Sequence, residues 1–113
     1  MITRASEQTL EMRPNMRGGN GEVALRALMP ELPGAMRLFS RIELAPGCSI
    51  GYHVHENETE LFFFASGSGR VSDDGIWTDV SAGDAMSTPS GHGHAVENTG
   101  SDPLVLLAAI VRD

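Results

Sequence analysis

Short apolar segments separated by glycine, proline and aspartate-glycine turns run through most of the chain, and this punctuation favours strands over helices. Pro30 and Gly34 separate two of the segments, and Asp74-Gly75 is a favoured two-residue hairpin turn. No helix of ordinary length is predicted. About nine or ten strands at this spacing indicate an all-β antiparallel sandwich or barrel. The expected strands are residues 22–29, 36–45, 50–55, 59–65, 70–72, 76–80, 84–88, 94–98 and 104–111.

The first 21 residues differ from the rest of the chain because residues 13–21 are rich in glycine and proline. Pro14 and three glycines lie within residues 13–21, which predicts a loop. We therefore expect two parts: an N-terminal arm and loop over residues 1–21, and a single barrel domain over residues 22–113. Such an arm could pack on a partner subunit or cover the barrel.

Length and composition exclude several function classes. A chain of 113 residues forms one domain. Its net charge of −7 argues against binding to nucleic acid or to an anionic membrane, because the phosphates would be repelled. All basic side chains are arginines, which excludes lysine Schiff-base chemistry, and Cys48 is the only cysteine, which excludes an intrachain disulfide. The sequence has no apolar run of signal-peptide or membrane length, so we expect a cytoplasmic protein.

All four histidines lie in two short clusters, His53 with His55 and His92 with His94. Residues two apart on a strand point to the same side, so the first cluster would present both imidazoles to one face. Glu60 follows a polar segment suited to a turn, so a neighbouring strand could carry its carboxylate back beside the two rings. His94 would arrive from a third strand. Three imidazoles and one carboxylate can hold a divalent ion and leave positions open, as expected of a reactive site.

The residues around both clusters resemble the paired signatures of the cupin superfamily. The resemblance covers residues 47–98 directly, with the short connection typical of compact microbial single-domain cupins. It implies an antiparallel double-stranded β-helix, the jelly-roll or cupin barrel, with His53, His55, Glu60 and His94 as the metal ligands. The two signatures read Gly47-x5-His53-x-His55-x4-Glu60-x6-Gly67 and Gly83-x5-Pro89-x-Gly91-x2-His94-x3-Asn98.

The ligand types leave the identity of the metal open. Imidazole suits zinc, copper, iron and nickel, whereas the carboxylate and open octahedral positions admit manganese. We expect one divalent transition metal per chain, with manganese or iron favoured over zinc or nickel. A hard oxygen chelate, such as a carboxylate or a keto or hydroxy acid, would replace water on this metal.

Two function classes fit this site. The first is a metal-dependent enzyme, which could be an oxidoreductase, a lyase or an isomerase because the fold does not fix the reaction. The chain is similar to small cupins related to oxalate-binding and oxalate-decarboxylase-type proteins, but it lacks an evident acidic lid segment for proton transfer. The second class is a non-enzymatic module that binds or senses a small acid or sugar through the metal.

Two polar residues near the ligands have expected roles of their own. His92 does not match a ligand position, so it is the candidate catalytic proton donor or acceptor, with a plain surface histidine as the alternative. Glu58 lies too close to His55 in sequence for the family pattern, so we expect a solvated turn residue.

Apolar side chains predict a pocket and a partner. Leu61 and Phe63 should point outward and residues 104–111 are apolar throughout, which favours burial in a homodimer over cover by loops or by the arm. Five other side chains are candidates for lining an apolar pocket, with plain core packing as the alternative for each: Phe39, Phe62, Phe64, Trp77 and Met86.

Overall fold

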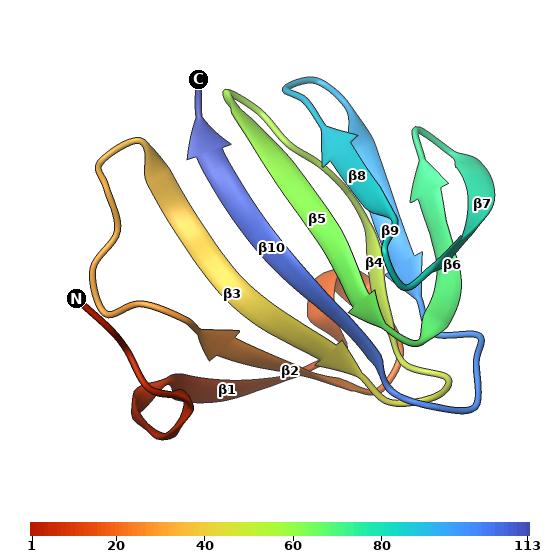
Figure 1. Ribbon diagram of the computed structural model, residues 1–113. Helices are drawn as coiled ribbons and strands as arrows, with labels where there is room; N and C mark the ends of the chain where they lie inside the picture. The colour runs from red at the N-terminus through yellow and green to blue at the C-terminus, as the bar shows by residue number, and fades with distance from the viewer.

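The computed structural model describes residues 1–113 and consists mainly of antiparallel strands (Figure 1). Two short 3-10 turns, η1 (Ala5–Glu7) and η2 (Met16–Gly18), lie near the N-terminus. The strands are β1 (Thr9–Pro14), β2 (Glu22–Ala27), β3 (Met36–Leu44), β4 (Ser49–Val54), β5 (Glu58–Ser66), β6 (Ser68–Asp73), β7 (Ile76–Ser81), β8 (Ala85–Thr88), β9 (Gly93–Glu97) and β10 (Leu104–Arg112).

The strands form two sheets, and the chain crosses between them several times. One sheet has the order β1-β2-β3-β10-β5-β8, and the other has the order β4-β9-β6-β7. The core cluster takes side chains from both sheets, such as Phe64 and Leu106 from the first and Ile50 and Val96 from the second, so the inner faces of the two sheets meet. The predicted all-β fold, a double-stranded β-helix, is therefore confirmed.

Alternation along the strands fills the space between the sheets. On β5, Phe62 and Phe64 are 5% and 0% exposed and join the core, whereas Leu61 and Phe63 are 46% and 47% exposed on the outer face. This is the orientation expected from the sequence, because successive side chains on a strand point to opposite faces. The other large core side chains are Val23, Leu25, Ile42, Leu44, Ile50, Val71, Val96, Leu104 and Leu106.

The N-terminal residues contain a strand that the sequence did not predict. Strand β1 pairs with β2 along its whole length, from Thr9 opposite Ala27 to Pro14 opposite Glu22. Leu10 and Met12 alternate with polar residues along β1, but all six of its residues are exposed, so the strand has no buried face. It is an edge strand, where a terminal proline is tolerated because the missing N–H leaves no ladder bond broken.

The turn η2 follows β1 and packs beside β4, where Figure 1 shows it as the orange coil. The residues expected to form an arm thus lie against both sheets. Neither of the short helices has the length or the apolar character needed to cross a membrane.

Candidate metal centre

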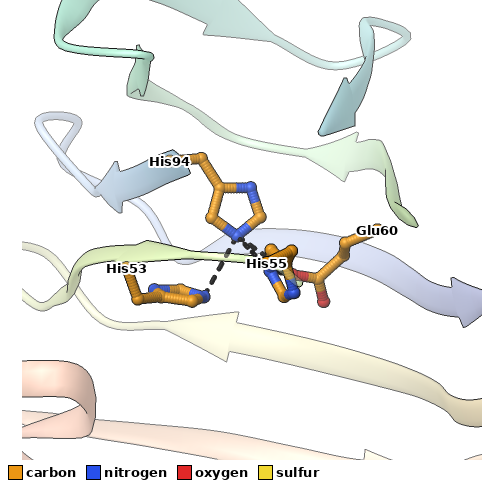
Figure 2. Close-up of side chains that lie close together, drawn as sticks. All are labelled: His53, His55, Glu60 and His94. Atoms are coloured by element: carbon orange, nitrogen blue, oxygen red, sulfur yellow. Dashed lines mark hydrogen bonds and ion pairs between the residues drawn. The ribbon is translucent and has the colours of Figure 1, made fainter. Parts of the chain in front are cut away.

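Four side chains from three strand regions point toward one spot between the sheets (Figure 2). The Nε2 atom of His94 lies 3.2 Å from Nε2 of His53 and 3.1 Å from Nε2 of His55. The Oε1 atom of Glu60 lies 3.0 Å from Nε2 of both His55 and His94. The structure therefore brings together the four residues that the sequence selected, with ligand atoms within 4.8 Å of one another.

Strand pairing explains why these side chains meet. His53 on β4 lies directly opposite His94 on β9, and paired residues in an antiparallel ladder point to the same face. His55 follows the end of β4, where its backbone N–H donates to the carbonyl of His92. Glu60 comes from β5 in the other sheet and points inward with Phe62. The cluster is therefore held from both sheets.

A hydrogen bond at each Nδ1 atom aims the opposite ring nitrogen at the cluster. Nδ1 of His53 lies 2.9 Å from the carbonyl of Gly51, which can only accept, so this nitrogen carries the proton. Nδ1 of His55 lies 2.6 Å from Oε2 of Glu58, and Nδ1 of His94 lies 2.7 Å from the hydroxyl of Thr88. Imidazoles that bind a metal through Nε2 have their Nδ1 atoms bonded in this way.

The electrostatics of the cluster favour neutral imidazole at the outermost ligand. Burial lowers the pKa of His53 to about 4, against the opposite effect of the hydrogen bond to Gly51, and the charges of His94 and Arg17 add to the decrease. A histidine must be neutral to donate its lone pair to a metal. The lone pairs that converge here repel one another unless a cation lies between them. The cluster is thus a potential site for a single metal ion.

Glu58 is not the solvated turn residue that we expected. Its side chain is 13% exposed, accepts from His55 and receives two hydrogen bonds from Arg37, at 2.6 and 2.7 Å. These contacts arise because Glu58 precedes Glu60 by two residues on the same face of β5. The hydrogen bonds from Arg37, with a smaller effect of His55, lower the pKa of Glu58 to about 2. Glu58 is therefore an ionised support for a histidine of the cluster.

A bulge in β3 places Arg37 beside the cluster. In the pairing of β3 with β10, Leu38 lies opposite Ile110 and Met36 opposite Val111, which leaves Arg37 outside the regular register. A bulge of this kind redirects a side chain, and bulges are common next to active sites. The sequence carried no signal for this position.

A cavity of about 50 Å³ opens beside His53, His55 and Glu60. This volume is small, since one water molecule takes up about 30 Å³ in the liquid. The walls combine apolar side chains with charged ones. The apolar residues are Met16, Leu25, Leu38, Ile42 and Ile110, and the charged residues besides Glu60 are Arg13, Arg17 and Arg37.

The aromatic side chains predicted to line the pocket do not line this cavity. Phe62 stacks on His94, with ring centroids 4.9 Å apart, and Phe64 packs against Phe62 in the core. Trp77 is 46% exposed on β7 under the guanidinium of Arg70. Met86 packs on the core, and Phe39 borders a neighbouring hollow between β1 and β3. Core packing, the alternative kept for each of these residues, describes Phe62, Phe64 and Met86, whereas Trp77 lies on the surface and Phe39 lines a different hollow.

His92 lies outside the cavity lining. Its side chain is 53% exposed and its Nδ1 bonds to Asp74 in the turn between β6 and β7. The hydrogen bond to Asp74, with the charge of that carboxylate, raises the pKa of His92. The residue proposed for proton transfer thus faces a surface carboxylate.

Residues 40–110, well over half of the chain, match the family model described as the cupin domain. The chain belongs to the cupin family. The matched residues include all four side chains of the cluster. This result agrees with the two histidine signatures and with the arrangement of the sheets.

Two related findings come from Thermotoga maritima. The chain is 42% identical over 113 residues to an oxalate-binding protein, a match that covers 98% of this chain and 93% of that protein. The crystal structure of a predicted oxalate decarboxylase from the same organism matches with a TM-score of 0.95 and 42% identity over 100% of both chains.

A more distant match shows the fold alone. A putative sugar phosphate isomerase from Acidithiobacillus ferrooxidans has a TM-score of 0.81 at 21% identity, over 99% of this chain and 75% of that one. The same barrel is thus found in a protein described by a different kind of activity, so the fold does not select the reaction.

Proposed function

We propose that this cupin binds one divalent metal through His53, His55, Glu60 and His94 and binds a small chelating acid at the open positions of that metal. The observation that carries the proposal is the hydrogen bond at each Nδ1 atom, which directs three Nε2 atoms to one point beside a carboxylate. Three imidazoles and one carboxylate leave positions free on an octahedral ion.

Three observations support a small carboxylate, or a keto or hydroxy acid, as the ligand. The relative with 42% identity is named as an oxalate-binding protein. The cavity is small, and three arginines border it. Arginine is the side chain best suited to planar, bidentate contact with a carboxylate.

For the metal we propose manganese or iron, with zinc and nickel as less favoured candidates, because the carboxylate and the open positions suit a hard octahedral ion. Elemental analysis of protein purified without a histidine tag tests this directly. We expect close to one transition metal per chain. Protein that carries no metal, and whose apo form takes none up, would contradict the proposal.

A second candidate function is binding or sensing without turnover. The observation that favours it is the cavity wall, where the titratable groups are the metal ligands and the arginines. For an enzymatic role that transfers a proton, His92 is the candidate donor or acceptor, provided that its side chain leaves Asp74. Measuring conversion of oxalate by the metal-loaded protein separates the two functions, since tight binding without product supports the binding module.

We also propose that two copies associate through the outer face of β5 and β10. Phe63 lies opposite Leu107 and Leu61 opposite Ala109, so these side chains form one apolar area.

The acidic charge continues to argue against nucleic acid and anionic membranes as partners, and we propose a cytoplasmic location. Residues 1–21 would act as an arm on a barrel domain formed by residues 22–113.

A further inference from the structure

Three arginines border the metal cavity, but only one of them has no carboxylate partner. Arg13 is paired with Glu11 at 3.0 Å, and Arg37 forms two hydrogen bonds with Glu58. The guanidinium of Arg17 takes part in none of the ion pairs or hydrogen bonds of the protein. Its positive charge is therefore available to a ligand.

The backbone around Arg17 is held in a fixed and strained conformation. Arg17 has a φ of 55° within η2, a left-handed conformation that is uncommon for a residue with a side chain. Two backbone hydrogen bonds close the turn, from Gly18 to Asn15 and from Gly19 to Met16, both at 2.9 Å. Such conformations persist only where the surrounding structure enforces them, and they cluster at binding sites.

Strand β4 enforces this conformation through a contact between backbones. A Cβ atom added at Gly51 would lie 2.1 Å from the carbonyl oxygen of Arg17, so only glycine permits the approach. Gly51 also accepts the hydrogen bond from Nδ1 of His53. One residue thus fixes both the turn that carries Arg17 and the ring of a metal ligand, which sets their relative positions.

The charges in the cavity determine what Arg17 can recognise. A divalent metal bound with Glu60 retains one positive charge, which a single carboxylate neutralises. A second negative charge on the same ligand would lie beside the apolar side chains of the cavity wall, where a charge without a partner is costly, and Arg17 is the arginine of that wall without a carboxylate partner. An arginine can offset that charge with two parallel hydrogen bonds.

We propose that Arg17 determines the specificity of this site by binding the negative charge of a metal-bound dianion that the metal does not neutralise. The cavity then selects small dianions, such as dicarboxylates, over monoanionic acids of the same size. This inference rests on the proposed function, because it requires a ligand that is anchored by the metal.

The test compares two chelating acids of similar size, oxalate as the dianion and glycolate as the monoanion, by calorimetric titration of the manganese-loaded protein. We expect Arg17→Gln to weaken oxalate binding by about 10- to 100-fold, the usual worth of a charge-assisted hydrogen-bond pair. Glycolate binding should change far less. Arg17→Lys keeps the charge without the planar fork and should recover part of the oxalate affinity.

Arg26→Gln is the matched control because it removes the same charge from a residue of β2 that does not line the cavity. It should leave both affinities unchanged. Unchanged oxalate affinity in Arg17→Gln, or loss of manganese binding in that variant, overturns the role of Arg17 and leaves the metal site standing. A wild-type protein that takes up manganese but binds neither acid overturns the carboxylate ligand as well.

Discussion

At the scale of single residues, the two histidines of the second cluster have different surroundings. His94 is 1% exposed and its Nε2 faces the other ligands, whereas His92 bonds to Asp74 on the surface. Replacing a metal ligand removes a bond to the ion, but replacing a surface histidine does not.

We therefore expect His94→Ala to lose most of its affinity for manganese while His92→Ala keeps nearly all of it. Titration of the apo proteins with manganese provides the measurement, and the wild-type protein is the reference. Equal losses in the two variants would mean that the wrong histidine has been assigned to the metal. If His92 transfers a proton, His92→Ala should also bind ligand normally while losing any turnover.

The second prediction at this scale concerns the support of His55. Glu58 accepts the Nδ1 hydrogen bond as a carboxylate held by Arg37. Glu58→Gln keeps the shape of the side chain but removes its charge. Loss of a residue that hydrogen-bonds a metal-binding histidine typically lowers metal affinity by about 10- to 100-fold. We expect manganese affinity to fall by that factor.

Glu56→Gln serves as the control for this change because Glu56 is a nearby, exposed carboxylate. Its metal affinity should match that of the wild type. Identical affinities in the Glu56 and Glu58 variants would show that the hydrogen bond to His55 contributes nothing to the site.

At the scale of elements, local patterns were predictable, and contacts between distant segments were predictable only where the cupin signatures indicated them, as for His53 and His94. The spacing of His53 and His55 on one strand, and the alternation that turns Phe62 inward and Leu61 outward, depend only on neighbouring residues. The same alternation places Glu58 beside Glu60, but the family spacing favoured a solvated turn residue at that position.

The arginines depend on features that lie outside any one strand. Arg37 reaches the site through a bulge in β3, and Arg17 arrives on a turn that packs against β4. Neither arrangement has a periodic signature, because a bulge interrupts the strand period and the turn is defined by contact with a distant glycine.

The contact between η2 and β4 gives a prediction for Gly51→Ala. The added Cβ would meet the carbonyl oxygen of Arg17 at 2.1 Å, and backbone cannot move aside as easily as the end of a side chain. We expect the free energy of unfolding to decrease by about 1–3 kcal/mol, as for other overpacked sites. Oxalate affinity should fall as well, since the turn carrying Arg17 must shift.

Denaturant unfolding measures the change in stability, with Gly34→Ala as the control. A Cβ at Gly34 meets no atom within 4 Å, and its φ is not positive. This variant should be as stable as the wild type or slightly more stable. If Gly51→Ala unfolds at the same denaturant concentration as the control, the turn is not fixed by this contact.

At the scale of the whole molecule, charge is distributed unevenly. The chain has a net charge of −7 and eight basic residues, all arginines, yet Arg13, Arg17 and Arg37 border the same small cavity. Glu11 and Glu58 pair with two of these arginines, so the unpaired charge of Arg17 is the one that can attract an anionic ligand to this cavity. This distribution fits a site for acids better than one for neutral sugars.

The last prediction concerns assembly. The outer face of β5 and β10 exposes Leu61 and Phe63 beside Leu107, an area that association of two copies would bury. We expect the wild-type protein to have about twice the chain mass of 12.1 kDa in light scattering. Phe63→Glu places a charge in the centre of that area and should give a monomer that still binds manganese.

The control for assembly is Ile76→Glu, which adds the same charge at a side chain that is 71% exposed on β7 in the other sheet. It should remain dimeric, because β7 lies outside the proposed interface. A wild-type protein that stays monomeric at millimolar concentration would refute the interface. If the Ile76 variant dissociates instead, the copies associate through the four-stranded sheet, and the apolar side chains of β5 need another partner.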